Sequence, residues 1–337
     1  MYKIVQINTV AVNGSTGRIT EGIGIAAKNR GYDTYIAYGR NIPSQSDSKL
    51  IKIGNNISVN EHVLETRLFD RQGLASRIAT KEFIRELEEL KPDLIHLHNI
   101  HGNYLNYKLL FNFLSEKCIP IVWTIHDCWA FTGHCVHFTA VNCDKWITGC
   151  FSCPRISSYP KSFFLDRSKR NFRDKKNAFC SVKNMTIVPV SNWLGDIISR
   201  SFLGVYPIQV IQNGIDTQVF YPRKNDIQFI KKKYGLENKF IILGVATGWS
   251  RENGLFDFIN LRRILNDNFV IVLVGVSKSL KNVLPKGIIG IERTDNQAEL
   301  AAIYTAADIF INGSFEETFG LVTACLLYTS PSPRDCS

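Results

Sequence analysis

A histidine and an aspartate stand side by side in VWTIHDCW, residues 122–129, at the point where an apolar run stops. The β-branched and aromatic residues before them predict a buried strand, so His126 and Asp127 fall at its carboxyl end. In open α/β sheets this edge faces the ligand crevice. An imidazole there can hydrogen-bond a sugar hydroxyl or exchange a proton. The alternative is a histidine that only caps the strand.

A glycine-containing turn near the N-terminus has the composition of a phosphate-binding loop. It lies in NTVAVNGSTGRIT, residues 8–20, between a predicted strand and a predicted helix. Gly14 and Gly17 permit a tight turn there. Ser15 or Thr16 can cap the helix, whose first N–H groups attract an anion. The turn is not G-x-G-x-x-G, so the fingerprint of nicotinamide dinucleotide binding is absent, and a turn that binds no ligand is the alternative.

Two further turns lie in the C-terminal half of the chain. GWSRENGLFDF, residues 248–258, follows a predicted strand, precedes a predicted helix and carries Arg251 as its only cation. It is the second place in the chain where a phosphate could bind. VIQNGID, residues 210–216, ends a predicted strand with Asn213 and a glycine, which is a turn signal without ligand chemistry of its own.

Four of the nine cysteines, from Cys135 to Cys153, lie close together in one irregular segment that ends in a C-x2-C pair. Disulfides are rare in the cytoplasm, so either reduced thiols or a metal site accounts for them. One C-x2-C pair among four thiols suits tetrahedral zinc, although the other two spacings match no standard zinc signature. The candidate structural zinc ligands are Cys135, Cys143, Cys150 and Cys153, with His134 and His137 in reserve.

The composition is that of a globular protein large enough for two domains. The chain has 337 residues, of which 45% are hydrophobic and 21% are charged. Its longest apolar run, residues 269–276, is too short to span a membrane, and the N-terminus lacks the apolar stretch of a signal peptide. We therefore expect a cytoplasmic protein, located at the inner face of the cell membrane if it binds lipid.

A net charge of +10 is compatible with several kinds of partner. The sequence has no helix-turn-helix signal and no aromatic-basic RNA signature, which argues against nucleic acid. The densest basic stretch is KSFFLDRSKRNFRDKKNAF, residues 161–179, with seven Lys or Arg between Lys161 and Lys176. It predicts a helix over residues 163–179. This helix either lies on anionic lipid as a peripheral membrane contact or is solvated with its Phe side chains packed inward.

Short β-branched runs alternate with helical periodicity along both halves, which is the signature of parallel βαβ units. The N-terminal half predicts strands at residues 3–8, 34–38, 93–98, 120–126, 186–190 and 209–212, and helices at 18–30, 76–90 and 104–117. The C-terminal half predicts strands at 240–246, 269–276, 288–291 and 308–311, and helices at 255–265 and 296–306. These elements must position the turns and the histidine described above.

The elements group into two domains. Residues 213–225, with their Gly, Asp and Pro, have the composition of a linker. An N-terminal domain, residues 1–212, would carry the cysteine-rich insert 127–160, and a C-terminal domain would cover residues 226–324. Each is expected to be a Rossmann-like parallel sheet with helices on both faces.

The motifs, taken in order, resemble one enzyme family. VSNWL, VIQNGID, GWSRENGLFDFINL, LVGVS and LPKGIIGIERTDNQAELAAIYTAADIFINGSFEETFGLVTA are similar to the C-terminal half of retaining GT-B glycosyltransferases. PDLIHLHNIHGNYLN, TIHDCWAFTGHC and CDKWITGCFSCP resemble the N-terminal half of the same group, which is glycosyltransferase family 4 or group 1 of the colanic acid, capsule and exopolysaccharide type. The resemblance runs from residue 1 to Ala324. It implies an α/β GT-B fold in which two Rossmann-like domains face a cleft.

The resemblance also implies an activity and a set of residues. The family transfers a sugar from a nucleotide diphosphate sugar to a lipid-linked or polysaccharide acceptor, with retention and without a metal. It implies catalytic roles for His126, Asp127 and Glu317, the last accepting hydrogen bonds from hydroxyls of the donor sugar. The residues expected to contact the donor and its phosphates are Gly14, Ser15, Thr16, Gly17, Asn213, Arg251, Thr294, Phe319, Gly320, Leu321 and Val322.

Two departures from the family pattern bear on this activity. Many relatives carry an Arg-Lys pair where this chain has Glu252 and Asn253, and Arg251 either compensates by a shift of the turn or does not. A second family glutamate falls at the position of Cys325, and the Ser/Pro-rich residues 325–337 lose the pattern. We therefore expect a second domain truncated at this point, an artefactual tail after it, and a chain that binds its donor poorly or not at all.

Two classes of function other than a transferase are a nucleotide-sugar-modifying enzyme and a binding protein without catalysis. A nucleotide-sugar dehydrogenase or epimerase would need a dinucleotide fingerprint and an acidic residue about 20 positions further on, and neither is present. A catalytically impaired nucleotide-sugar-binding protein, or a zinc-stabilised binding protein, stays open because of Glu252 and Asn253. Transfer of a labelled sugar to membrane lipid would separate the enzyme from the binding protein.

Overall fold

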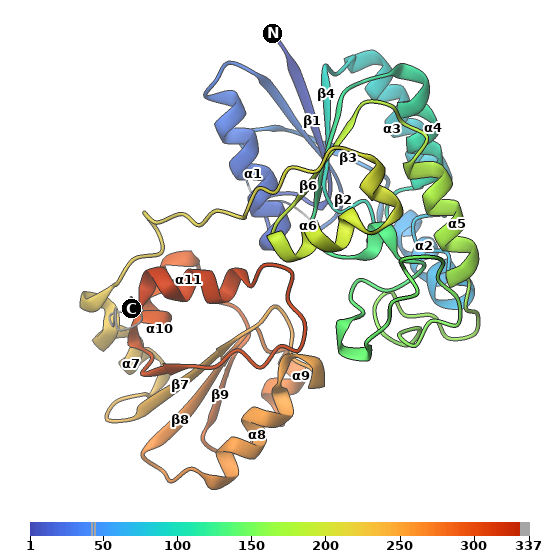
Figure 1. Cartoon of the computed structure of the whole chain (residues 1–337). Coiled ribbons are helices and arrows are strands. Elements are labelled where there is room, and N and C mark those ends of the chain that lie inside the picture. The colour runs from blue at the N-terminus through green and yellow to red at the C-terminus, as the bar shows by residue number, and fades with distance from the viewer. Residues whose placement is uncertain (42, 44, 331–337) are drawn as a thin grey trace. The chain divides into compact units, whose positions relative to one another are not determined.

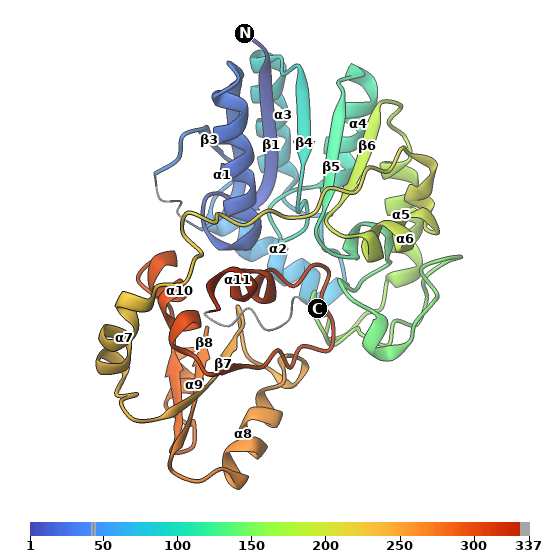
Figure 2. The same cartoon turned by 60° about the vertical axis from the view of Figure 1, so that its left-hand side comes forward.

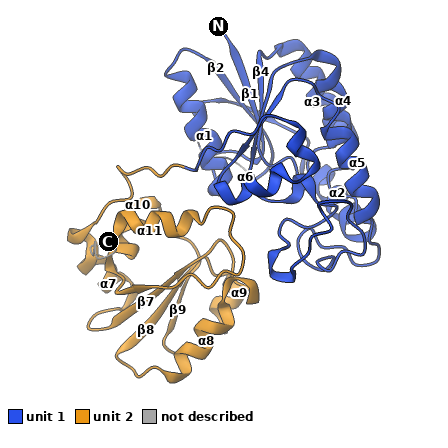
Figure 3. Cartoon of the chain, in the orientation of Figure 1, with its two compact units in different colours: residues 1–213 blue, residues 214–337 orange. Residues whose placement is uncertain are grey.

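The computed structural model divides the chain into two compact units, residues 1–213 (unit 1) and residues 214–337 (unit 2) (Figure 3). It describes residues 1–41, 43 and 45–330. The division falls at the first residue of the segment expected to be a linker, 213–225. A short 3-10 turn, Lys224–Asp226, overlaps the end of that segment and leads into α7 (Ile227–Tyr234). Each unit contains a parallel sheet of its own.

Unit 1 is built on a six-stranded parallel sheet (Figure 1). Its strands are β1 (Lys3–Val10), β2 (Asp33–Arg40), β3 (Lys49–Lys52), β4 (Leu94–Leu97), β5 (Ile121–Ile125) and β6 (Met185–Pro189). They lie in the order β3-β2-β1-β4-β5-β6, so the direction of progression reverses between β1 and β4. Doubly wound sheets bind ligands outside the carboxyl ends of the strands at such a reversal. The residues that follow β1, β4 and β5 are therefore placed to form a site.

Within the described part of unit 1, six α-helices accompany this sheet. They are α1 (Gly14–Lys28), α2 (Asn56–Phe69), α3 (Arg77–Leu90), α4 (Tyr107–Lys117), α5 (Ser168–Phe179) and α6 (Asn192–Ser199). Figures 1 and 2 show α1 on one side of the sheet and α3 and α4 on the other. Apolar side chains at helical spacing determine which face of α3 packs inward, since Phe83 and Leu87 are buried between exposed charged residues.

Several boundaries differ from the sequence prediction. The helix expected over 18–30 already begins at Gly14, and the helix expected over 163–179 begins only at Ser168. Residues 209–212 do not form a strand. Their backbone makes single hydrogen bonds to β6 instead, such as the N–H of Gln209 to the oxygen of Ile187 at 2.9 Å. The elements β3, α2 and α6 were not predicted.

The insert between β5 and α5 is irregular, as expected, but it has a small core of its own. Two 3-10 turns, Trp129–Phe131 and Thr139–Val141, are its only helical pieces among the described residues. Phe131, Phe138 and Trp146 are buried and in contact, with ring centroids 5.0–6.4 Å apart. Burial of three aromatic side chains stabilises a segment that has almost no regular backbone hydrogen bonding.

Unit 2 contains a four-stranded parallel sheet. Its strands are β7 (Phe240–Val245), β8 (Phe269–Val274), β9 (Ile288–Ile291) and β10 (Ile309–Phe310), in the order β10-β7-β8-β9. The helices are α7, α8 (Leu255–Ile264), α9 (Lys278–Lys281), α10 (Gln297–Ala306) and α11 (Leu321–Thr329). Alternate residues of β7 enter different cores: Leu243 packs on the α10 and α11 side, and Ile242 on the α8 side. The sheet is therefore buried on both faces.

The last described helix runs past Ala324, the expected end of the second domain. Helix α11 continues through Cys325 to Thr329, and both side chains are buried. Cys325 belongs to the same hydrophobic cluster as Tyr304 of α10, whose hydroxyl donates to the backbone oxygen of Val322 at 3.0 Å. The expected domain end at Ala324 is therefore not a boundary of the helix. The remainder of the predicted tail, residues 331–337, lies outside the described residues.

Within the residues that the structure describes, no helix combines the length and the apolar character needed to cross a bilayer.

Candidate active site

Polar side chains gather where strands β4 and β5 of unit 1 end. His98 directly follows β4, and His126 and Asp127 directly follow β5. A cavity at this edge is lined by these residues and His101, together with the aromatic side chains of Trp123 and Trp129. The strand ends meet because β4 and β5 are parallel neighbours in the sheet. Two residues expected from sequence, His126 and Asp127, thus share a cavity with two histidines that were not singled out.

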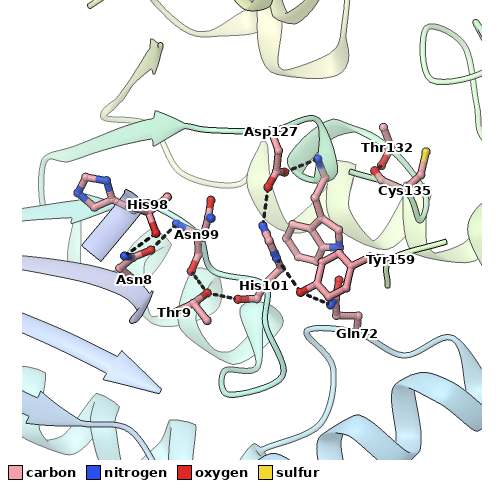
Figure 4. Close-up of polar contacts among 12 residues, drawn as sticks. Asn8, Thr9, Gln72, His98, Asn99, His101, Asp127, Thr132, Cys135 and Tyr159 are labelled. Atoms are coloured by element: carbon pink, nitrogen blue, oxygen red, sulfur yellow. Dashed lines mark hydrogen bonds and ion pairs between the residues drawn. The ribbon is translucent and has the colours of Figure 1, made fainter. Parts of the chain in front are cut away.

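His101 and Asp127 form a hydrogen-bonded pair at this cavity (Figure 4). Nε2 of His101 lies 2.8 Å from Oδ2 of Asp127, and Oδ1 accepts the backbone N–H of Trp129, also at 2.8 Å. Burial alone would raise the pKa of Asp127, but the charge and hydrogen bond of His101 and the N–H of Trp129 lower it to about 2. An ionised carboxylate therefore fixes the orientation of the His101 ring.

The other nitrogen of the His101 ring contacts Tyr159 from the insert. Nδ1 lies 3.3 Å from the Tyr159 hydroxyl, which accepts a hydrogen bond from Nε2 of Gln72 at 3.1 Å (Figure 4). Burial raises the pKa of Tyr159 to about 12, so its hydroxyl stays protonated. The N–H at Nε2 of His101 donates to Asp127, and Nδ1 shares a hydrogen bond with the Tyr159 hydroxyl. Gln72, Tyr159, His101 and Asp127 thus form one continuous chain of hydrogen bonds.

His98 and His126 form a second hydrogen-bonded pair. Nδ1 of His98 lies 3.2 Å from Nε2 of His126, and Nε2 of His98 lies 3.2 Å from Oε1 of Gln6 on β1. Burial lowers the pKa of His126 to about 4 and that of His98 well below its usual value of 6.5. Both rings are therefore neutral at pH 7. The sequence did not predict Gln6 or His98 as site residues, although His98 lies at the end of a predicted strand.

Asn8 ties the first predicted phosphate-binding turn to the same edge. Its Nδ2 donates to the Thr16 hydroxyl at 3.2 Å, and its Oδ1 accepts the N–H of Asn99 at 3.2 Å. The neighbouring Thr9 hydroxyl contacts the backbone oxygens of Asn99 at 3.0 Å and of His101 at 2.5 Å (Figure 4). The turn at the start of α1 and the loop that carries His101 are therefore held together by side chains of β1.

The helix that follows this turn begins earlier than predicted. Because α1 starts at Gly14, Ser15 and Thr16 lie inside its first turn, and their predicted role as caps is wrong. Gly14 adopts a left-handed φ of +74°. A Cβ at Gly17 would lie 3.2 Å from backbone atoms of the preceding turn, so glycine permits this close approach. The N–H groups of the first turn remain candidates for binding an anion.

A second group of predicted residues follows the strands of unit 2. Arg251 lies in a 3-10 turn after β7 that ends at Gly254, with a left-handed φ of +79°. A Cβ at Gly254 would lie 2.8 Å from Cα of Gly313, in the loop after β10. The N–H of Phe315 in that loop donates to the oxygen of Glu252 at 3.0 Å. The Arg251 turn and the loop after β10 are therefore packed against each other.

The remaining predicted donor residues lie on the same edge of the unit 2 sheet. Glu317 is exposed in the loop between β10 and α11, and Phe319 and Gly320 end that loop. Gly320, with a φ of +74°, turns the chain into α11, which begins with Leu321 and Val322. Thr294 follows β9. Asn213 is the last residue of unit 1 and belongs to neither group.

The four candidate zinc ligands line one cavity of the insert, next to Phe138 and Trp146. Sγ of Cys150 accepts the N–H of Gly133 at 3.1 Å, and a hydrogen bond from Cys135 lowers the pKa of Cys153 to about 6. Among the residues that the structure describes, no three His, Cys, Asp or Glu side chains form a group that could hold a metal ion. Zinc binding by Cys135, Cys143, Cys150 and Cys153 stays a prediction.

The basic segment 161–179 is arranged differently from the predicted amphipathic helix. Phe163, Phe164 and Leu165 precede α5 and are 53%, 75% and 47% exposed, whereas the Phe side chains within α5 are buried. Lys175 is also buried. Its ammonium donates to the backbone oxygen of Trp129 at 2.7 Å and lies 3.5 Å from the centre of the Trp129 indole ring. Burial lowers the pKa of Lys175 to about 7. The cations that remain exposed are Lys161, Lys169, Arg170, Arg173 and Lys176.

Known proteins resemble the chain in both sequence and fold. Residues 17–219, more than half of the chain, match the sequence family described as Glycosyltransferase Family 4. A protein of Escherichia coli (strain K12) named as a colanic acid biosynthesis glycosyl transferase, WcaC, is 26% identical over 227 residues, covering 63% of this chain and 54% of that protein. Alpha-monoglucosyldiacylglycerol synthase of Acholeplasma laidlawii is 23% identical over 269 residues, covering 74% and 60%. The chain thus spans little more than half the length of the curated relatives it matches.

A solved structure shares the fold. It is Anabaena Alr3699/HepE in complex with UDP-glucose, with a TM-score of 0.62 and 14% sequence identity, covering 98% of this chain and 79% of that chain. At this identity the likeness concerns the fold alone. Together with the parallel sheet in each unit, it confirms the predicted α/β GT-B fold with two Rossmann-like domains.

Proposed function

This chain belongs to Glycosyltransferase Family 4, and from that premise we propose that it transfers a sugar from a nucleotide diphosphate sugar to a lipid-linked or polysaccharide acceptor. Transfer proceeds with retention at the anomeric carbon, in the synthesis of cell-surface polysaccharide. The observation that carries the proposal is the cavity lined by His98, His101, His126 and Asp127 beside the reversal of the unit 1 sheet. The names of the two relatives, one for colanic acid and one for a glucosylated lipid, support these acceptor classes.

In this proposal the polar groups of unit 1 handle hydroxyls. The neutral ring of His126 exchanges hydrogen bonds with a sugar hydroxyl, since burial keeps it uncharged at pH 7. Asp127 stays ionised and holds His101 in one orientation. The N–H groups in the first turn of α1, at Gly14 to Gly17, stabilise negative charge on the leaving diphosphate.

The polar groups of unit 2 handle the donor. Glu317 accepts hydrogen bonds from hydroxyls of the donor sugar, and Thr294 lies by the base. The N–H groups at the start of α11 and the Arg251 side chain stabilise the diphosphate. The Anabaena protein of the same fold was solved with UDP-glucose, which supports a nucleotide sugar as the donor.

His126→Ala tests the proposed catalytic site. We expect turnover with the correct acceptor to fall at least about 10-fold, because general acid–base and hydroxyl-positioning groups contribute this much or more. Turnover is measured by transfer of radiolabel from a nucleotide sugar to membrane lipid. The dissociation constant of the nucleotide sugar serves as the control. It should change less than about 2-fold, because the groups proposed to bind the donor lie mainly in unit 2 and are unchanged. Unchanged turnover would remove His126 from the site.

A non-catalytic nucleotide-sugar-binding protein is the second candidate, and one observation favours it. Glu252 and Asn253 occupy the turn after β7 where relatives carry Arg and Lys, and Asn253 is bonded to the Ser250 hydroxyl at 3.0 Å. This turn therefore offers the phosphates only one cation, Arg251. Binding of labelled nucleotide sugar without transfer to any lipid or saccharide acceptor would favour this candidate.

We also propose that the exposed Phe163–Leu165 tip and its neighbouring cations contact an anionic membrane, where a lipid-linked acceptor resides. Three consecutive exposed apolar side chains precede a helix that keeps Lys169, Arg170 and Arg173 in solvent. Apolar side chains enter the interface while cations remain at the headgroups, each contributing about 1 kcal/mol. This placement corresponds to the inner face of the cell membrane.

Replacing both phenylalanines tests this surface. Phe163→Ser/Phe164→Ser is expected to lower partitioning onto phosphatidylglycerol vesicles at least about 10-fold, since a buried Phe contributes ~1.5–3 kcal/mol. Co-sedimentation with these vesicles, and with neutral phosphatidylcholine vesicles, measures the effect. Phe256→Ser, at a Phe that is 57% exposed in unit 2, is the matched control. Equal loss with both variants, or equal binding to neutral vesicles, would show that this segment is not the membrane contact.

A further inference from the structure

Three buried polar side chains on neighbouring strands form a row that ends at the candidate active site. Gln6 on β1 is 1% exposed, His98 after β4 is 1% exposed, and His126 after β5 lines the cavity. Oε1 of Gln6 lies 3.2 Å from Nε2 of His98, and Nδ1 of His98 lies 3.2 Å from Nε2 of His126. The two ring planes are within 17° of parallel with centroids 5.5 Å apart, as in an in-plane N–H···N hydrogen bond.

The donor and the acceptor of each hydrogen bond in this row follow from the contacts of Gln6, the member that lies furthest from the cavity. Nε2 of Gln6 donates to the backbone oxygen of Thr20 at 2.7 Å, and a carbonyl oxygen can only accept. The amide oxygen of Gln6 therefore faces His98 and requires a proton on Nε2 of that ring. A neutral imidazole carries one proton, so Nδ1 of His98 is an acceptor and Nε2 of His126 must donate to it.

Three further features keep the row in this state. Burial lowers the pKa of both histidines, so neither ring gains a second proton at neutral pH. Helix α1 packs closely over Gln6, since a Cβ at Gly24 would lie 3.4 Å from Nε2 of Gln6. The indole N–H of Trp123 also donates to the backbone oxygen of His98 at 2.9 Å, which holds the His98 backbone in place.

We propose that Gln6 is a positioning residue for the proposed sugar transfer: acting through His98, it holds His126 as the Nε2–H tautomer, so that Nδ1 of His126 is the acceptor nitrogen for a substrate hydroxyl. This inference rests on the proposed function. A hydroxyl that donates its proton to Nδ1 keeps its oxygen lone pairs available for bonding. The opposite tautomer would present an N–H to the same hydroxyl and occupy one of those lone pairs.

The tautomers can be read directly from nitrogen-15 NMR of the imidazole rings in the whole chain, which has seven histidines. In the wild-type chain we expect His98 and His126 both as Nε2–H tautomers. A wild-type spectrum with His98 as the Nδ1–H tautomer would overturn the inference without any variant. The measurement needs no substrate, so it stays decisive even if the chain transfers no sugar and the proposed function fails.

Gln6→Met replaces the amide group, including the oxygen that faces His98, by an apolar side chain of similar length. We expect His98 to change to the Nδ1–H tautomer and His126 to follow, with kcat falling about 10-fold and the donor KM changing less than about 2-fold. Thr124→Val is the matched control, because it removes a buried hydrogen bond to His96 at 2.8 Å and keeps all three side chains of the row; the His96 ring lies 4.2 Å from the His98 ring, so this control includes any effect of disturbing that neighbour. A changed tautomer with unchanged kcat, or the same loss of kcat in Thr124→Val, would overturn the positioning role.

Discussion

Lowering the pH from 7 to 5 is expected to reduce the free energy of unfolding of unit 1 by about 6 kcal/mol. Burial lowers the pKa of His62 to about 3, that of His96 to about 4 and that of His98 well below its usual value of 6.5, and all three side chains are less than 10% exposed. Each gains a proton at pH 5 only when the unit unfolds. The contribution of each is about 2 kcal/mol, and the three together approach the total stability of a typical domain, about 5–15 kcal/mol.

The sign of this effect follows from the direction of the shifts. Because the folded pKa values lie below 6.5, the unfolded chain binds more protons between roughly pH 4 and pH 6.5, and stability falls as the pH falls through this window. Asp127 acts in the same sense but at a lower pH. Its pKa is lowered from 3.8 to about 2, so its stabilising contribution is lost only below about pH 4, outside the range compared.

Unit 2 provides an internal control, because all seven histidines of the chain lie in unit 1. Hydrogen exchange followed by mass spectrometry, corrected for the intrinsic effect of pH, resolves peptides from each unit. Protection in β1, β4 and β5 should fall strongly at pH 5, while protection in β7 and β8 should change little. Equal protection of unit 1 at both pH values would contradict the prediction.

Asp70→Ala is expected to lower the free energy of unfolding of unit 1 by about 2–5 kcal/mol, because each buried donor left without its acceptor costs about 1–3 kcal/mol. Asp70 ends α2 and is 1% exposed. One carboxylate oxygen lies 2.6 Å from Nδ1 of the fully buried His134, and the other accepts the N–H of Arg167 at 2.8 Å. Removing the carboxylate leaves both donors buried without their partner.

Urea denaturation of the whole chain measures this loss. Asp47→Ala is the matched control, because Asp47 pairs with Lys28 at 3.0 Å while both side chains are more than half exposed, 57% and 52%. Exposed pairs of this kind contribute less than about 1 kcal/mol. If Asp70→Ala lowers the free energy of unfolding no more than Asp47→Ala does, the contacts of Asp70 do not stabilise the packing of the insert against the end of α2.

The sequence was sufficient to predict the strands of the two sheets other than β3, because their runs of β-branched and apolar residues are continuous. It was not sufficient for β3, which has four residues and no buried face. It was also not sufficient for α2, in which Asn, Ser, His and Thr residues interrupt the apolar spacing typical of a helix. Residues 163–167 were predicted to be helical because their Phe and Arg residues resemble the pattern of α5. Local pattern alone could not show that these residues are held by tertiary contacts, such as Phe163 N–H to the oxygen of Arg67 at 2.7 Å.

For the candidate site, position at a strand end was the useful signal. His126, Asp127 and Arg251 were predicted because each follows a predicted strand, whereas Glu317 was predicted only from the family resemblance. Gln6 and Tyr159 could not be found in this way, since one is buried in mid-strand and the other lies in an irregular insert. Their roles depend on contacts across 92 and 58 positions of sequence, to His98 and His101. Such contacts are set by the topology of the sheet and leave no local pattern.

The contacts of Asp70 also constrain the order of events while the chain is being synthesised. Its partners lie 64, 97 and 101 positions later, at His134, Arg167 and Asn171. At a ribosomal rate of about 5–20 residues per second, the last of them emerges roughly 5–20 seconds after Asp70. Until then the carboxylate must stay hydrated, because burying it alone would cost several kcal/mol. We therefore expect the nascent chain to assemble its early strands first and to close the end of α2 only when the insert and α5 have both left the ribosome.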